Sequence, residues 1–218
     1  MNYYEIRSQI ESLPKNPSSL QKLQVFAEYS DAEVRVDAIE ALSEYGNDKD
    51  IAKLLISHLK KDEDELVRTS CAEILGSYPD KEVSGYLVEA LDDESDLVIA
   101  AAALSLAEIS DVNVIPDVNV IGKLESKLEK ASPWLSVSLH IGLYFLGEKN
   151  SLELLLKFLN NDDYRVRCAT ANLLKYYSKP EDVTKIINIL KSRLQIEQTR
   201  AVLSSIKSAI EDLSEIKK

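Results

Sequence analysis

The sequence predicts an all-α protein: a right-handed solenoid of about six antiparallel helix pairs, preceded by an N-terminal capping helix. Three observations support this class. A motif recurs with its first apolar residue at positions 34, 67, 98, 135, 166 and 199, so that successive copies are 31 to 37 residues apart. The 218 residues include only six Gly and six Pro. In addition, β-branched and polar residues do not alternate over any long run, as they would in half-buried strands.

The motif is clearest at residues 64–76, and near copies occupy residues 31–42 and 163–174. Each copy contains a Val-Arg pair, and a Leu follows the Arg after seven residues. Weaker copies span residues 95–106 and 132–143, where Val98 and Leu135 take the place of the motif Val, and a degenerate copy has Thr199 and Arg200 at the Val-Arg position. A nearly constant period of this size is typical of stacked helical repeats.

These copies resemble the HEAT-repeat family, and within it the short repeats of phycobilisome lyases with the pattern Asp-x-x-Val-Arg-x-x-Ala-x-x-Ala-Leu-Gly. The first copy departs only at Ser43, where Gly is usual, and the second has Cys71 and Ile74 in place of the two alanines. The resemblance covers roughly residues 18 to 214. It implies stacked helix pairs whose second helices line a concave surface, and motif arginines that pair with an Asp of an adjacent turn. Most members of the family are interaction scaffolds, and a few are enzymes.

The elements follow in order. Apolar residues at 3, 6, 10 and 13 predict a capping helix that ends before Pro14 and Pro17. Asp31 is expected to cap the helix that follows it, and Gly46 to end that helix. The predicted helices span residues 3–13, 18–29, 31–45, 50–60, 64–78, 82–91, 95–109, 120–130, 133–146, 151–159, 164–177, 181–194 and 196–216.

We expect one domain, residues 1–218, with a cap at 1–17 and repeats at 18–46, 47–79, 80–110, 111–147, 148–179 and 180–218. The step of 37 residues places an insertion at residues 110–119. Its valines favour a loop that packs over the apolar ridge, and a dedicated binding loop is the alternative.

The net charge of −11 is unevenly distributed. Residues 28–111 hold 22 acidic and 7 basic side chains, a balance of −15, and the remainder holds 15 acidic and 19 basic side chains, a balance of +4. An acidic scaffold attracts basic ligands and repels phosphate backbones. This charge favours a basic protein partner and disfavours nucleic acid.

The candidate binding surface follows from helical periodicity. Residues three, six and ten positions after the motif Val share the helix face opposite the buried one. That face is acidic in the N-terminal copies and turns apolar and aromatic in the C-terminal ones. The alternative is an ordinary solvated surface with acidic turn and cap residues. The predicted partner-binding residues are Asp37, Glu40, Glu44, Glu73, Glu108, Ile141, Phe145 and Tyr176.

The sequence contains no Gly-rich phosphate loop, nucleophile elbow or metal cluster, which argues against an enzyme and predicts neither a cofactor nor a metal. Cys71 and Cys168 are expected to be core thiols, and His58 and His140 have no second ligand at metal spacing. Enzymes of this fold include alkylpurine DNA glycosylases and phycobilin lyases. The residues that could serve a nucleic-acid binder are Arg165, Arg167, Lys175, Lys179, Lys185, Lys191, Arg193 and Arg200.

The functional hypothesis is a non-enzymatic protein-binding module, specifically a bacterial immunity protein that neutralises a basic toxin, such as a nuclease domain, by mimicking the charge of its substrate. The alternatives are a nucleic-acid-binding or glycosylase-like protein that uses the basic C-terminal half, and a lyase-like or regulatory scaffold subunit. No window of 18 apolar residues and no export signal are found in the sequence, so we expect a cytoplasmic monomer without a membrane partner.

Overall fold

The computed structural model describes residues 2–110 and 119–216 of the chain. In that part of the chain it contains thirteen α-helices, one short 3-10 helix and no strand. The all-α class predicted from the sequence is therefore confirmed. None of the described helices is long and apolar enough to cross a membrane. Residues 111–118 of the predicted insertion lie outside the described residues, so neither interpretation of the insertion is tested.

The helices gather into two compact units, Met1–Val120 and Ile121–Lys218, which we call unit 1 and unit 2. Each unit is described by itself. The single domain and the right-handed superhelix expected for the whole chain stay predictions.

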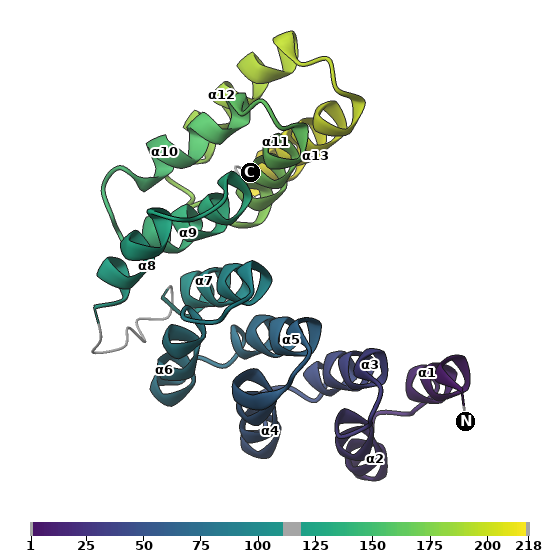
Figure 1. Ribbon diagram of the computed structural model, residues 1–218. Coiled ribbons are helices and arrows are strands. Elements are labelled where there is room, and N and C mark those ends of the chain that lie inside the picture. Colours follow the sequence, from purple (N-terminus) through teal and green to yellow (C-terminus); the bar gives the residue numbers. More distant parts are fainter. Residues whose placement is uncertain (1, 111–118, 217–218) are drawn as a thin grey trace. The chain divides into compact units, whose positions relative to one another are not determined.

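Unit 1 consists of two rows of helices (Figure 1). In the first row, α1, α3, α5 and α7 pack one on the next, and the second row holds α2, α4 and α6. Each helix of the second row packs against the helix that follows it in the chain. Since α1 packs on α3 at the end of the first row, it is the capping helix that the sequence predicts. The bounds are α1 (Tyr3–Glu11), α2 (Pro17–Ala27), α3 (Ala32–Ser43), α4 (Lys49–Lys61), α5 (Glu65–Leu75), α6 (Lys81–Ala90) and α7 (Asp96–Ser110).

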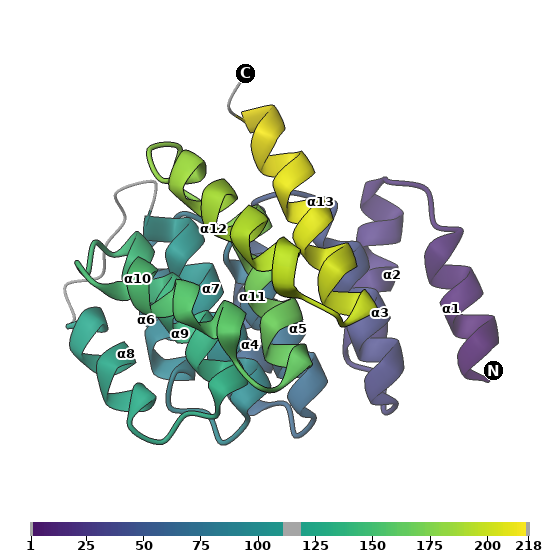
Figure 2. The same ribbon diagram turned by 90° about the horizontal axis from the view of Figure 1, so that it is seen from above.

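Unit 2 repeats this arrangement. Its first row is α9, α11 and α13, in which α11 packs on both neighbours, while α10 packs against α9 and α12 against α13. Figure 2 shows α12 and α13 side by side. The bounds are α8 (Val120–Leu128), α9 (Pro133–Phe145), α10 (Ser151–Lys157), the 3-10 helix η1 (Phe158–Asn160), α11 (Tyr164–Tyr176), α12 (Val183–Ile196) and α13 (Arg200–Ile216).

The motif explains both the caps and the core. Asp31, Asp64 and Asp163 each accept a backbone N–H two residues ahead at 2.9 Å, as N-cap residues do. The motif Val or Leu at the start of α3, α5, α7, α9 and α11 and the Leu eight residues later are buried, and burial of one such side chain contributes about 1.5–3 kcal/mol. Gly46 has φ +75° just beyond α3, a conformation that favours glycine. The predicted caps, helix stop and core positions are confirmed.

The largest difference from the predicted helix boundaries is at the start of the last helix, while the other ends lie within three residues of the prediction. The last helix begins at Arg200, whereas the sequence interpretation began it at Ile196 and was wrong at this end. The physical reason is Glu197, whose backbone is extended and whose carboxylate accepts the N–H groups of Gln198 and Thr199 at 3.0 and 2.9 Å. Ile196 instead ends α12.

Candidate functional site

Three of the predicted acidic residues, Glu40, Glu73 and Glu108, lie on the consecutive first-row helices α3, α5 and α7, and we call them the acidic row. All three residues are exposed at the surface, but neighbouring atoms partly cover the carboxyl group of Glu73. Burial by neighbouring atoms raises the pKa of Glu73 above its ordinary value, and the negative charges of Glu40 and Glu108 raise it further. The packing of α3 on α5 and of α5 on α7 therefore brings together carboxylates that are 33 to 35 residues apart in the chain.

Glu108 lies where α7 approaches the C-terminal end of α5 closely. A Cβ added to Gly76, which follows α5, would lie 2.7 Å from Glu108 Oε2 and 2.8 Å from Ser105 Oγ. The Ser105 hydroxyl donates to the carbonyl of Ala72 at 2.8 Å, which ties α7 to α5 at this point. The Gly of the motif thus leaves space for the carboxylate that completes the acidic row.

Asp37 on α3 and Glu44, the residue that follows α3, lie on the side facing the capping helix. Together with Glu40 they line a pocket of about 370 Å³ between α1 and α3, which we call the α1–α3 pocket. The Asp37 side chain is only 17% exposed, and its Oδ2 lies 4.0 Å from Nε of Arg7 on α1. Arg7 was not among the predicted site residues, because the apolar spacing of α1 indicates a capping helix and contains no signal for a polar partner.

The three predicted apolar contact residues have different surroundings. Ile141 is fully buried in α9, so the structure does not present it on the surface. Phe145 makes edge-to-face contacts with Tyr144 and Tyr177, with ring centroids 5.3 and 6.1 Å apart. Tyr176 is 71% exposed, and Nζ of Lys175 lies 5.1 Å from its ring centroid. Of these three residues, Tyr176 offers a partner the most apolar surface.

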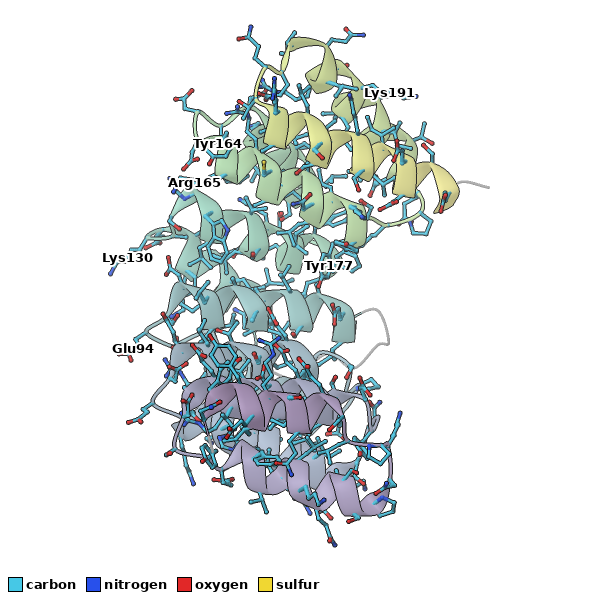
Figure 3. The ribbon with its side chains drawn as sticks, turned by 90° about the vertical axis from the view of Figure 1, so that its right-hand side faces the viewer. Glu94, Lys130, Tyr164, Arg165, Tyr177 and Lys191 are labelled. Carbon is cyan, nitrogen blue, oxygen red and sulfur yellow. The ribbon has the colours of Figure 1, made fainter. Side chains whose placement is uncertain are left out.

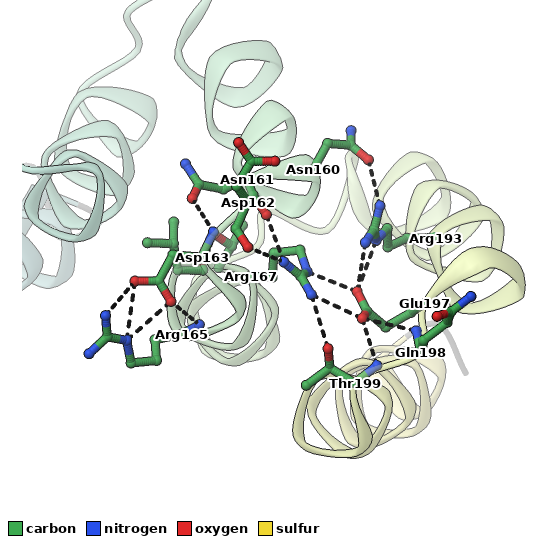
Figure 4. Close-up of polar contacts among 12 residues, drawn as sticks. Asn160, Asn161, Asp162, Asp163, Arg165, Arg167, Arg193, Glu197, Gln198 and Thr199 are labelled. Carbon is green, nitrogen blue, oxygen red and sulfur yellow. Dashed lines mark hydrogen bonds and ion pairs between the residues drawn. The ribbon is translucent and has the colours of Figure 1, made fainter.

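The motif arginines form buried ion pairs with the next repeat, which we call the arginine bridges: Arg35–Asp62, Arg68–Asp93 and Arg167–Glu197. In each bridge the guanidinium donates from Nε and Nη2 to the two carboxylate oxygens, at distances between 2.6 and 3.0 Å. Nη1 donates to two carbonyls of the turn that precedes the arginine, as Figure 4 shows for Arg167. The structural role expected for these arginines is confirmed.

The basic side chains of the C-terminal end are largely engaged within unit 2. Five of the eight candidates have an acidic partner: Arg165 with Asp163, Arg167 and Arg193 with Glu197, Lys175 with Asp212 and Lys185 with Glu153. Figure 3 shows Arg165 and Lys191 on opposite sides of unit 2. These five ion pairs reduce the positive charge that a phosphate backbone would meet on unit 2.

The cysteines and histidines are placed as follows. Cys71 is buried, and burial raises the pKa of its thiol far above the ordinary value, so the thiol stays protonated; neither Cys71 nor Cys168 forms a disulfide. His58 lies between Asp62 and Glu28, with Nδ1 3.0 Å from Asp62 Oδ2. Burial lowers the pKa of His140. No group of three or more side chains that could hold a metal ion is found among the residues with described positions.

The stacked helix pairs and the arginine bridges define an α-helical repeat protein, and a known repeat family matches part of its sequence. Residues 52–119 match the family model for HEAT repeats. The resemblance seen in the motif is therefore confirmed. No curated protein sequence matches the chain.

Solved structures resemble the chain in fold. The complex of CpcE and CpcF of phycocyanin lyase from Nostoc sp. PCC7120 contains a chain with a TM-score of 0.50 and 17% identity, covering 93% of this protein and 98% of that chain. An engineered protein has a TM-score of 0.45 and 16% identity, with coverages of 99% and 98%. An archaeal HEAT-like repeats protein from Thermococcus onnurineus NA1 has a TM-score of 0.40 and 14% identity, with coverages of 100% and 99%.

Proposed function

We propose that this protein is a non-enzymatic binding module whose acidic row captures a basic protein partner. The observation that carries the proposal is the meeting of Glu40, Glu73 and Glu108 from three consecutive repeats, close enough that the outer two raise the pKa of the middle one. Repulsion between neighbouring carboxylates destabilises the folded protein. A bound cation relieves this repulsion, so such a row favours the binding of a basic partner.

The charge distribution supports a basic partner in particular. The acidic segment, residues 28–111, has a balance of −15 and includes the acidic row and the α3 side of the α1–α3 pocket. A field of this sign accelerates the approach of a basic protein and disfavours phosphate backbones. HEAT repeats are also, as a class, protein-interaction scaffolds, which is an argument by analogy of fold.

Within this proposal, the specific partner that best fits the chemistry is a basic toxin such as a nuclease domain, and the protein would act as its immunity protein. A nuclease has a basic surface that accepts phosphates, and a line of carboxylates can occupy that surface in place of the nucleic acid. The predicted cytoplasmic location and monomeric state belong to the same proposal.

Two alternative functions receive less support. The basic residues that a nucleic-acid binder or a glycosylase-like enzyme would need are mostly held by Asp and Glu of unit 2. The likeness to the CpcE and CpcF complex is one of fold, and the lyase-like reading rests on that analogy. An electrophoretic shift with duplex DNA that disappears in Arg165→Glu/Lys175→Glu would favour the nucleic-acid alternative.

The test is binding to a short arginine- and lysine-rich peptide as a mimic of a basic protein surface. The wild-type protein should bind it, and affinity should fall as salt rises from about 50 to 500 mM. In the variant Glu40→Gln/Glu73→Gln/Glu108→Gln, affinity should fall by about tenfold or more, since each charge-assisted contact is worth a factor of several.

The matched control changes the net charge equally but elsewhere. Glu33→Gln/Glu63→Gln/Glu82→Gln replaces three exposed carboxylates of unit 1 outside the acidic row. Affinity in this variant should stay within about threefold of wild type, because only long-range attraction is lost. Equal losses in the two variants would show that net charge, and not the acidic row, governs binding.

A further inference from the structure

His140 occupies a position that is apolar in four of the other five copies of the motif. It lies on α9, five residues after the motif residue Leu135. The equivalent residues, all fully buried, are Ile39, Ala72, Ala103 and Ala171. His140 is buried as well, with 7% of the residue exposed, so unit 2 holds an imidazole where the other repeats have hydrocarbon. A polar group at such a position destabilises the fold unless it has partners.

The neighbours of the His140 ring do not supply such partners. Its Nδ1 is buried and has no hydrogen-bond partner in the part of the chain with described positions. The ring of Phe158, from the 3-10 helix η1, has its centroid 5.9 Å from that of the imidazole and is tilted by 46°. This position accommodates the neutral imidazole, because burial of a charge without an acceptor costs far more than burial of a neutral polar group.

Few charges act on His140. The helix α9 has no other charged residue, and η1 has none. On the two helices that pack against α9, which are α10 and α11, the charged side chains are Glu153, Lys157, Arg165, Arg167 and Lys175. All of them except the exposed Lys157 form ion pairs with other residues of unit 2.

The remaining titratable groups do not offset a positive charge on His140. Glu148, beyond the end of α9, is the one charged group of the described residues that favours the protonated ring, and it is itself held by hydrogen bonds from Asn150 and Ser151. The other titratable side chains of α9 and α11 are tyrosines and Cys168, which do not gain a charge in acid.

We propose that His140 makes unit 2 sensitive to mild acid, because its protonation opens the contact between α9 and η1. An imidazolium donates from both nitrogens, and the buried position provides no acceptor for Nδ1. The element that yields is η1, a single turn of three residues whose hydrogen-bond geometry is poorer than that of an α-helix. Phe158 is already partly exposed, and its displacement admits water to the ring.

The direction of the pH dependence follows from burial. Burial lowers the pKa of His140 below its ordinary 6.5, and the charge of Glu148 opposes this effect only in part. The unfolded chain therefore binds the proton more tightly, so stability that is present above pH 6.5 is lost as the pH falls below it. Between pH 7.5 and 5.5 the equilibrium constant for unfolding should rise by up to about tenfold, the gain of an unfolded histidine in this interval.

Trp134 provides a local probe, because it is the only tryptophan of the chain and lies on α9 itself. Urea denaturation of the full chain, followed by Trp134 fluorescence at pH 7.5 and 5.5, measures the equilibrium constant for unfolding. We expect this constant to be about three- to tenfold larger at pH 5.5 in the wild-type protein. A ratio below about twofold would overturn the proposal.

Variants that cannot gain this proton isolate the role of His140. His140→Ala introduces the residue found at three equivalent positions, and His140→Gln keeps a neutral polar group; both should show a ratio below about twofold. Each variant is compared with itself at two pH values, so a change in its overall stability does not affect the result. The control His58→Gln removes the other histidine of the chain and should keep the wild-type ratio. A ratio that persists in both His140 variants would contradict the proposal.

Hydrogen exchange locates the opening. On going from pH 7.5 to 5.5, amides of α9 and η1 should lose protection by about threefold or more, after correction for the intrinsic pH dependence of exchange, while α3 and α5 keep theirs. His140→Gln should remove the loss. An equal loss of protection in both units would show a response of the whole chain, and the opening of the contact between α9 and η1 would be ruled out.

Discussion

Arg167 and Glu197 form a buried two-point ion pair, in which Nε donates to Oε2 at 2.8 Å and Nη2 donates to Oε1 at 3.0 Å (Figure 4). The two residues are 30 positions apart and connect α11 to the end of α12. The hydrogen bond from Arg167 is the largest reason that the pKa of Glu197 lies well below its ordinary value. Each arginine bridge thus links one repeat electrostatically to the next.

Loss of one partner of this pair should strongly destabilise unit 2. Both side chains are less than 10% exposed, so Arg167→Met or Glu197→Gln leaves a buried group without its counterpart. We expect the free energy of unfolding to fall by about 3–5 kcal/mol in either variant. Urea denaturation measures it. The double variant Arg167→Met/Glu197→Met should recover part of the loss, and a double variant less stable than both single ones would argue against this account.

The arginine bridges also predict acid sensitivity. Burial raises the pKa values of Asp62 and Asp93, but the hydrogen bonds from Arg35 and Arg68, together with backbone N–H groups and the arginine charges, outweigh it and hold both pKa values below the ordinary 3.8. The pKa of Glu197 lies below its ordinary 4.5. A carboxyl whose pKa is lowered by folding stabilises the protein above its unfolded pKa, and that stability is lost as pH falls through the folded pKa. Stability should therefore fall steeply below about pH 4.

For Glu73 we expect a smaller pH dependence of stability, of opposite sign. Its pKa is raised above 4.5, so the folded protein binds this proton more tightly than the unfolded chain and gains stability as pH falls toward 4.5. With His140 replaced by alanine, denaturation midpoints from pH 7 to 3 should first rise slightly and then fall. Glu73→Gln should remove the initial rise and keep the fall, and a rise that persists in this variant would need another titrating group.

Substitution by alanine should have opposite effects on stability at Gly76 and at Gly85. At Gly76 a Cβ would collide with Glu108 Oε2 and Ser105 Oγ, so Gly76→Ala should cost about 1–2 kcal/mol as α5 and α7 are pushed apart. Gly85 lies inside α6 with nothing within 4 Å of an added Cβ, and Gly85→Ala should stabilise by about 0.5–1 kcal/mol. Thermal denaturation of both variants measures the contrast. A stabilising Gly76→Ala would mean that the Glu108 side chain moves away freely.

Removal of the Tyr144 hydroxyl should destabilise unit 2. Its hydroxyl donates to Asp182 Oδ2 at 2.7 Å and accepts the N–H of Lys179 at 3.0 Å, which fastens the segment before α12 to α9. Tyr144→Phe keeps the ring and should cost about 1–3 kcal/mol, because both partners lose a hydrogen bond. Tyr164→Phe changes an exposed tyrosine and should cost less than about 0.5 kcal/mol in the same urea titration.

The sequence by itself determined the repeats, and with them most of the local structure. The Asp, Val and Leu of each copy determine the cap, the start and the buried face of a helix through contacts within a few residues. These features can therefore be predicted from a short segment of sequence. The same periodicity placed Glu40, Glu73 and Glu108 on equivalent positions of successive helices. The helix ends were predicted less accurately. Glu197 contacts Arg167, 30 residues away, and α13 begins only after it, at Arg200.

The tertiary structure alone decided which side chains meet. Periodicity assigned Asp37 and Glu44 to the same surface as the acidic row, but the packing of α1 on α3 places them along an open pocket that Arg7 and Lys15 also line. It also buried Ile141 and paired five basic side chains of unit 2 with carboxylates. Such outcomes depend on the distance between helices, which sequence spacing does not encode, since the same helical face can be covered by a neighbour or left to solvent.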